Sequence, residues 1–346
     1  MRTLPTFLTF IFLFNLTGYS QEQLFDIPIF AYHRFGDSRY PSTNIPDEVF
    51  SKQLEYLKEN QIQVLTFGQV ENLWRSGKPV PKKAVILTID DGYLCFYTNA
   101  WPLLKEYGFK ATIFIQTETV GGGDFMTWSQ IREIEKAGIE IGNHSASHAY
   151  FVNITESERK SKFREDLLKS NADFKKHLGH LPEYYAYPYG EFTIDMEAVL
   201  KQHEIKAALV QQSGVFSESS DPYAIPRFPM GGVFASLEGF INKTAMKALR
   251  VSATSPDSPF YKKNPPNLKI ELIPGLLDLE KAQFFVQGSK MEITEINTKS
   301  NPPYIIIKSD QKINSRRTLY TITAPSPDGS SWHWYSYLWI RTEVKE

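Results

Sequence analysis

Short β-rich runs alternate with amphipathic helical segments from residue 27 to about residue 250, and this alternation limits the fold more than any other feature of the chain. Strands that are separated by helical crossovers pair in parallel, because each crossover returns the chain to the same end of the sheet. The pattern therefore predicts an α/β fold with a parallel sheet, open or closed into a barrel. The expected strands are 27–32, 84–89, 111–115, 140–143, 184–187 and 206–209, and the expected helices are 48–60, a segment reaching residue 104, 128–137, 156–178, 195–202 and 237–248.

The pattern changes after residue 251. Residues 252–267 are rich in Ser and Pro, which is typical of a linker. Beyond them the helical period disappears and short strand candidates follow one another, as in a β-sandwich. We therefore expect a C-terminal all-β sandwich-like domain at 268–346, with strands at 268–273, 284–287, 291–296, 304–307, 318–323 and 332–340. The last of these strands is aromatic on both faces, so one face is expected in the sandwich core and the other either against the first domain or as a sugar-binding platform.

The expected strand 84–89 ends in two adjacent carboxylates and a glycine, Asp90, Asp91 and Gly92. Neighbouring side chains on an extended strand point to opposite sides. A turn that begins at Gly92 would let both carboxylates reach one pocket. An ordinary turn with two solvated acids has the same composition, so the triplet alone leaves both interpretations open.

A second short apolar run ends in two imidazoles four residues apart, His144 and His148. If these residues formed a helical turn, both rings would lie on one face. One carboxylate and two imidazoles are a recurring ligand set for a catalytic divalent metal that keeps a position open for water. A second carboxylate would then be free to act as a base. Surface imidazoles without a ligand are the alternative.

Four segments of the chain resemble the NodB-type polysaccharide deacetylases, carbohydrate esterase family four. The string Thr-Ile-Asp-Asp-Gly at 88–92 is similar to the first motif of the family, and His-Ser-Ala-Ser-His at 144–148 is similar to the second. Tyr-Ala-Tyr-Pro-Tyr-Gly at 185–190 resembles the third motif in one branch, and Ile-Phe-Ala-Tyr-His-Arg at 29–34 resembles the N-terminal strand of that branch. The branch includes deacetylases of biofilm poly-N-acetylglucosamine and peptidoglycan N-deacetylases.

The resemblance implies a distorted (β/α) barrel with its site at the carboxyl ends of the strands. It also implies that Asp91, His144 and His148 bind one divalent metal ion, with zinc expected and other transition metals also suited to the ligands. By the same resemblance Asp90 is the general base, and the backbone N–H of Tyr189 helps to hold the oxyanion.

The chain departs from the family pattern in two places. It has no late Leu-x-His motif, which supplies the general acid in most members, and His33 matches the position that replaces it in the biofilm branch. A buried histidine with a purely structural role is the alternative for His33. Many members also have an arginine where this chain has Ala186. We hypothesise that Arg227 replaces it and keeps Asp90 ionised and oriented, although Arg227 could equally be a surface ion-pair partner.

The function implied is metal-dependent de-N-acetylation of N-acetylglucosamine residues in a cell-envelope or extracellular polysaccharide, with release of acetate. The expected partner is the N-acetylated polysaccharide, which would be peptidoglycan or an exopolysaccharide. Two alternatives stay open at this point. An esterase that removes O-acetyl groups would use the same metal site, and a catalytically inactive glycan-binding protein on the same fold would explain the departures at the general acid and at Ala186.

Composition adds limits on partners and location. The 38 Lys and Arg residues nearly balance the 39 Asp and Glu residues, which argues against a nucleic-acid partner. Arg2, the apolar run 7–16 and the small residues near 20 are typical of a signal peptide at 1–20, followed by a catalytic domain at 21–251. We therefore expect an exported protein, periplasmic or extracellular, without a transmembrane helix in its mature form. A retained N-terminal anchor is the alternative, and the oligomeric state is left open.

Overall fold

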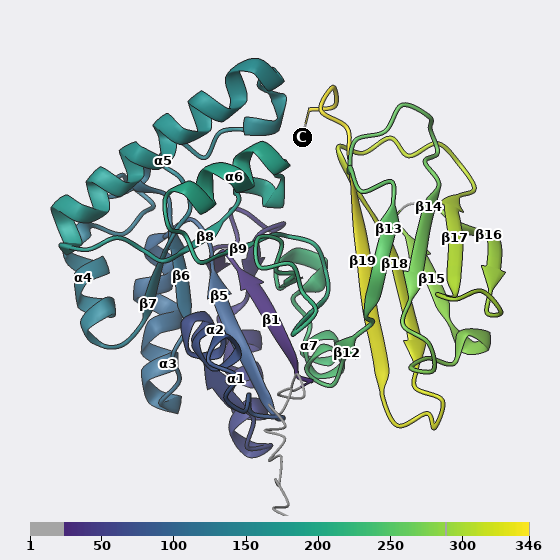
Figure 1. Ribbon diagram of the computed structural model, residues 1–346. Coiled ribbons are helices and arrows are strands. Elements are labelled where there is room, and N and C mark those ends of the chain that lie inside the picture. The colour runs from purple at the N-terminus through teal and green to yellow at the C-terminus, as the bar shows by residue number, and fades with distance from the viewer. Residues whose placement is uncertain (1–23, 288, 346) are drawn as a thin grey trace, which may run out of the picture.

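The computed structural model describes residues 24–287 and 289–345, and its first part is a curled, mostly parallel sheet surrounded by helices (Figure 1). In spatial order the sheet contains β10 (Val215–Ser217), β1 (Asp26–Tyr32), β5 (Ala84–Ile89), β6 (Thr112–Ile115), β7 (Glu140–Asn143), β8 (Tyr184–Ala186) and β9 (Ala207–Leu209), with β11 (Phe228–Pro229) beside β1 and β4 (Gln63–Leu65) beside β5. Every pair is parallel except that of β1 with β10. The predicted parallel sheet of a distorted (β/α) barrel is thereby confirmed.

In the described part of the chain six α-helices connect strands of this sheet, and a seventh leads from β11 to the C-terminal part. They are α1 (Asp47–Glu59), α2 (Phe67–Arg75), α3 (Trp101–Tyr107), α4 (Trp128–Lys136), α5 (Glu156–Leu178), α6 (Ile194–Gln202) and α7 (Leu237–Thr244). A π-helical turn, Phe96–Ala100, leads into α3, and a small separate sheet pairs β2 (Arg34–Phe35) with β3 (Asn44–Ile45). No helix in the described part of the chain is both long and apolar enough to cross a membrane.

The central strand β5 is buried on both of its faces. Val85, Leu87 and Ile89 contribute to one hydrophobic core, and Ala84 and Ile86 contribute to another. A strand that is covered on both sides has a continuous apolar sequence rather than alternating apolar and polar residues. Burial on both faces therefore fixes the strand firmly, and it fixes the position of the acidic residues that follow it.

The C-terminal part consists of two four-stranded sheets that share one hydrophobic core (Figure 1). The first contains β12 (Lys247–Ala248), β19 (Trp332–Ile340), β18 (Arg317–Pro325) and β15 (Gln283–Val286), and the second contains β13 (Val251–Ser255), β14 (Leu268–Leu272), β17 (Tyr304–Ser309) and β16 (Met291–Asn297). Ile270 and Ile305 of the second sheet belong to the same core as Tyr320 and Trp339 of the first. The predicted sandwich-like arrangement of β-strands is confirmed.

The two parts of the chain are joined along β12 and β19. Strand β12 follows α7 and pairs in parallel with β19, and Trp334 of β19 packs edge-on against Phe228 at 5.3 Å between ring centroids. The outer aromatic face of this strand therefore contacts the barrel. The start of the expected linker is part of a strand instead: residues 251–255 form β13, whose Ser- and Thr-rich sequence is largely exposed at the edge of the second sheet. The domain boundaries near residue 251 stay a prediction, and the expected signal peptide lies outside the described residues.

Candidate active site

Several strands of the barrel end at the same edge of the sheet, and the polar residues that follow them meet there. In a parallel sheet the carboxyl ends of the strands lie together, which is where barrel enzymes place their chemistry. His33 follows β1, Asp90 and Asp91 follow β5, His144 follows β7, residues 187–189 follow β8, and Gln211 comes two positions after the end of β9. The structure thus brings the residues predicted from four separate motifs to one place.

Asp91, His144 and His148 form the cluster that the sequence predicts as a metal site. One ligand atom from each residue lies within 4.8 Å of the others. The Asp91 Oδ1 atom is 3.4 Å from the Nε2 atom of His144 and 3.4 Å from that of His148. A carboxylate oxygen and two ring nitrogens that face one another in this way are suited to a divalent cation.

The protonation of His144 also fits a metal ligand. Its Nδ1 atom lies 2.7 Å from the carbonyl oxygen of Ala186, so Nδ1 carries the proton and donates it. The lone pair of Nε2 is then directed toward Asp91. This Nε2 atom is buried and makes no hydrogen bond within the described residues. A buried ring nitrogen without a partner needs an explanation, and a bound cation supplies one.

The electrostatic surroundings of the cluster keep two of its residues, Asp91 and His148, in their metal-binding forms. Burial, together with the neighbouring His144, lowers the pKa of His148 to about 4, so this ring is neutral near pH 7. Burial alone would raise the pKa of Asp91, but the adjacent His144 ring, whose Nε2 atom is 3.4 Å away, and the other nearby imidazoles outweigh it and hold the pKa below its usual value. Asp91 is therefore a carboxylate at neutral pH.

The two histidines do not lie on a helical turn, contrary to the sequence expectation. Residues 144–148 form a loop in which Ser145 (φ 69°) and His148 (φ 54°) have left-handed backbone conformations. The loop is held by side chains: Asn143 Oδ1 accepts the Ser145 N–H at 2.8 Å, and the Asp166 carboxylate accepts the next two N–H groups at 2.8 and 2.9 Å. The expectation was wrong because these local hydrogen bonds compete with a helix.

Arg227 lies against Asp90, at the position that the sequence hypothesis gives it. Its Nη1 atom is 2.7 Å from Asp90 Oδ1 and its Nη2 atom is 2.8 Å from Oδ2, which is a two-pronged pair between fully buried side chains. The guanidinium also donates to Thr88 Oγ1 at 3.1 Å and to the carbonyl of Val210 at 3.0 Å. Arg227 is therefore not a surface residue.

The pair determines the charge of Asp90. Burial would raise the pKa of this carboxyl, but the charge of Arg227 beside it outweighs burial and holds the pKa below its usual value. Asp90 is consequently an ionised carboxylate within a buried site, fixed in one orientation by the fork of the guanidinium. A carboxylate in this state accepts protons, as a general base must.

His33 faces Asp90 rather than the apolar core. Its Nε2 atom is 3.8 Å from Asp90 Oδ2, and 18% of its side chain is exposed. The Nε2 atom of Gln211 lies 3.3 Å from His33 Nε2 and 3.5 Å from Asp90 Oδ2, so one amide contacts both groups. We did not predict Gln211 from the sequence, although a polar residue two positions after a strand end was a signal for it.

Tyr189 lies directly over the histidine cluster. Its ring packs edge-on against His148 at 4.5 Å and stacks on Tyr150 at 3.7 Å with an angle of 5° between the planes. Its backbone has a φ of 60°, which a tyrosine rarely adopts. The following Gly190 has a φ of 70°, and a Cβ atom there would lie 2.3 Å from the backbone nitrogen of Gln211. The loop at 187–191 therefore rests tightly against the end of β9.

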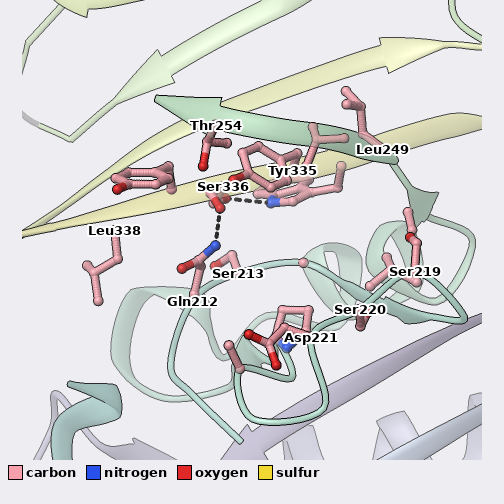
Figure 2. A pocket seen from close by; sticks show the side chains of 18 of the residues that line it. Gln212, Ser213, Ser219, Ser220, Asp221, Leu249, Thr254, Tyr335, Ser336 and Leu338 are labelled. Atoms are coloured by element: carbon pink, nitrogen blue, oxygen red, sulfur yellow. Dashed lines mark hydrogen bonds between the residues drawn. The ribbon is translucent and has the colours of Figure 1, made fainter. Parts of the chain in front are cut away.

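A cavity of about 350 Å³ lies between the barrel and the C-terminal sheets (Figure 2). Gln212 and Ser213 line it from the barrel side, and Tyr335, Ser336 and Leu338 line it from β19. Gln212 crosses the gap and donates a hydrogen bond to the carbonyl of Ser336. The residues that line this cavity are distinct from the carboxylate and histidine cluster, so the size of the cavity does not locate the chemistry; the convergence of ionisable groups does.

A curled (β/α) barrel with an Asp-His-His cluster and a second buried carboxylate beside it is the arrangement that the resemblance to the polysaccharide deacetylases implies. Comparisons with known proteins agree. Residues 77–208 match the family described as Polysaccharide deacetylase, and the chain therefore carries a polysaccharide deacetylase domain, a hydrolase.

Named relatives make the similarity more specific. The chain is 26% identical over 201 residues to YxkH of Bacillus subtilis (strain 168), which is named as a polysaccharide deacetylase; the match covers 58% of this chain and 70% of that protein. It is 27% identical over 194 residues to the poly-beta-1,6-N-acetyl-D-glucosamine N-deacetylase of Escherichia coli (strain K12), covering 45% of this chain but only 29% of that protein. The solved structure of IcaB from Ammonifex degensii superposes with a TM-score of 0.56 at 26% identity and covers 62% of this chain and 95% of that one.

Proposed function

We propose that this protein removes acetyl groups from N-acetylglucosamine residues of a cell-envelope or extracellular polysaccharide and releases acetate. The observation that carries the proposal is the cluster of Asp91, His144 and His148 beside the buried carboxylate of Asp90. The similarity to a poly-N-acetylglucosamine deacetylase supports an exopolysaccharide or another polymer of N-acetylglucosamine as the substrate. Zinc is the ion that we propose for the cluster, because two imidazoles and a carboxylate suit it.

A bound ion would polarise the acetyl carbonyl and make a water molecule more acidic. Asp90 takes the proton of the attacking water, since Arg227 keeps it ionised and oriented. The backbone N–H of Tyr189 donates to the oxygen that becomes negatively charged. His33, whose Nε2 atom is 3.8 Å from Asp90 Oδ2, donates a proton to the departing amine. The products are acetate and a free amino sugar.

The state of Asp90 speaks against an inactive glycan-binding protein. A buried ion pair costs desolvation energy and is weak evidence for stability in itself. A fold that only bound sugar would have no need for a desolvated carboxylate next to three ligand-type side chains. The position of Arg227 also removes one reason to suspect inactivity, because this arginine can do the work of the residue missing at Ala186.

We further propose that the protein is exported and that residues 21–251 form the catalytic domain, with 252–267 as a linker and 268–346 as a separate C-terminal domain. The similarity to deacetylases of extracellular polysaccharide supports export. A signal peptide at 1–20 would provide the route. Cell fractionation of a strain that expresses the full chain tests export, because retention of the protein in the cytosol would reject it.

Acetate release from defined oligomers tests the proposed function. Purified protein is incubated with N-acetylglucosamine oligomers and with O-acetylated xylan oligomers, with and without a chelator. Asp90→Asn removes the proposed base without changing size, and Asp310→Asn on the exposed surface of the C-terminal sheets is the matched control.

Release from the N-acetylated oligomers should stop with the chelator and with Asp90→Asn but not with Asp310→Asn. Release from the O-acetylated oligomers alone would identify an esterase. No release from either substrate by zinc-loaded protein would identify a binding protein and refute the proposal.

A further inference from the structure

Arg316, immediately before β18 of the C-terminal sheets, is inserted into the rim of the candidate active site. Its guanidinium is almost fully buried and has five N–H groups, and each has an acceptor. Nε and Nη2 donate to the two oxygens of Glu191 at 2.8 and 2.7 Å, and Nη2 also donates to Asn153 Oδ1 at 2.9 Å. Nη1 donates to the carbonyls of Thr342 and Val344 at 3.3 and 3.0 Å. One residue thus ties the C-terminal tail to two loops of the barrel.

The loop that Arg316 holds is the one that carries Tyr189. Glu191 comes two residues after Tyr189, and the Arg316 guanidinium also lies 4.3 Å from the centre of the Tyr150 ring. Tyr150 in turn stacks on Tyr189, which packs against the metal-site residue His148. A continuous series of contacts therefore runs from the C-terminal sheets to the histidine cluster.

The neighbouring Arg317 contacts the same loop from β18. Its Nη1 atom is 3.3 Å from Glu191 Oε1, and its guanidinium is 5.6 Å from the centre of the Tyr189 ring. Tyr189 needs such support, because a tyrosine keeps a left-handed backbone conformation only where its surroundings fix it from several sides. Side-chain stacking fixes the ring, and the Glu191 carboxylate fixes the backbone that follows.

We propose that the C-terminal sheets complete the active site, with Arg316 as a positioning residue that acts through Glu191 and Tyr150 to hold the Tyr189 backbone in place. The inference rests on the proposed function, in which the Tyr189 N–H donates to the developing oxyanion. It assigns a catalytic purpose to the part of the chain that lies beyond the polysaccharide deacetylase match, which ends at residue 208.

Arg316→Lys tests the proposal, because lysine keeps the charge but cannot reach five acceptors or form the two-pronged pair. Arg250→Lys is the matched control: Arg250 makes a two-pronged, mostly buried pair with Glu218 at 2.7 and 2.9 Å, and this pair also contacts Asp26 and the backbone of Phe25 and Ala248, at the start of β1 and at β12. Loss of one oxyanion donor lowers kcat by about 100-fold to 1000-fold, so a displaced donor should lower it by at least about 10-fold. KM and metal content should not change, and Arg250→Lys should leave kcat as in the wild type.

Amide hydrogen exchange measures the positioning without relying on activity. In Arg316→Lys the backbone amides of residue 187 and of residues 189–191 should exchange faster than in the wild type, whereas in Arg250→Lys they should not. Glu191→Gln provides the second variant if Arg316→Lys does not fold, and it should give the same two changes.

The outcomes are distinguishable. Wild-type kcat and wild-type exchange at 187–191 in both folded variants would overturn the proposal and leave Arg316 as a structural contact only. If the wild-type protein releases no acetate from any oligomer, the proposed function fails. The exchange comparison still decides in that case whether Arg316 holds the loop.

Discussion

Replacing Arg227 with lysine should reduce turnover strongly while leaving the metal site intact. The guanidinium makes four hydrogen bonds, two to Asp90, one to Thr88 and one to the carbonyl of Val210. Lysine keeps the positive charge, but a single nitrogen cannot bond both oxygens of Asp90 in a fixed plane. A hydrogen bond to a charged group contributes about 1.5–3 kcal/mol. Loss of one such bond from the transition state corresponds to roughly a 10-fold to 150-fold lower kcat.

Steady-state kinetics on an N-acetylglucosamine oligomer, with metal content measured on the same samples, checks this prediction. Arg159→Lys is a suitable control, since Arg159 is a half-buried arginine that pairs with Asp195 at 3.3 Å outside the site. A wild-type kcat in Arg227→Lys, with the metal retained, would refute the argument that the guanidinium orients Asp90. Loss of metal together with activity would show that Arg227 acts through the structure of the cluster instead.

Three further substitutions test other parts of the structure. His148→Ala should weaken zinc binding by at least about 100-fold, measured by competition with a chelator, because it removes a ligand rather than an outer partner. Gly190→Ala should lower the free energy of unfolding by on the order of 2 kcal/mol in thermal denaturation, since its Cβ would meet the backbone of Gln211 at 2.3 Å; an unchanged Tm would contradict this. Burial opposes ionisation of Glu218, but the hydrogen bond and charge of Arg250 outweigh burial and lower the pKa of Glu218 below its usual value. The ion pair therefore stabilises the fold fully at a pH above the unfolded-state pKa of Glu218. This stabilisation is lost as the pH falls through the folded-state pKa. The Tm difference between wild type and Glu218→Gln should therefore be larger at pH 7 than below about pH 4, and a constant difference would reject the linkage.

The elements of the fold were predictable where the sequence carries a local signal. Strand β7 and helix α5 have the predicted bounds. The buried residues Phe163, Leu167 and Phe174 of α5 recur at helical spacing, and the helix ends at Gly179 in a left-handed conformation. Helix α2 was not predicted, although Thr66 and Gln69 form a capping box, which is a sequence signal for the start of a helix. Strands β10 and β11 have two or three residues each and exist only through pairing with β1, so no local pattern reveals them.

The predictable part of the site consists of residues within short motifs. Asp90, Asp91 and the two histidines are recognisable because each motif is contiguous and follows a strand. Gln211 and Glu191 were missed, because their importance depends on contacts with segments more than 100 positions away in the chain. The position of Gln211 after a strand end is a weak signal, but only the tertiary structure shows which residues it and Glu191 contact.

Most of the non-glycine residues with a strained, left-handed backbone conformation lie at the candidate active site. Six non-glycine residues in the described part of the chain have positive φ; four of them, Asp91, Ser145, His148 and Tyr189, lie at the site, and the other two are Gln61 and Glu204. The latter two come just after the ends of α1 and α6, where glycine is the preferred residue.

Gln61→Gly and Glu204→Gly should therefore each stabilise the protein by up to about 1 kcal/mol, because glycine has no Cβ penalty in this conformation and only part of the gain is offset by unfolded-state entropy. Acetate release should be unchanged, since neither side chain belongs to the site. Glycine at the four site positions would also relieve strain, but it would remove side chains that the site needs. The side chains of Asp91 and His148 are proposed metal ligands, and the ring of Tyr189 stacks on Tyr150. A lower Tm for both helix-end variants would mean that left-handed residues in this fold carry no strain, and the argument that Tyr189 needs support from Arg316 would lose its basis.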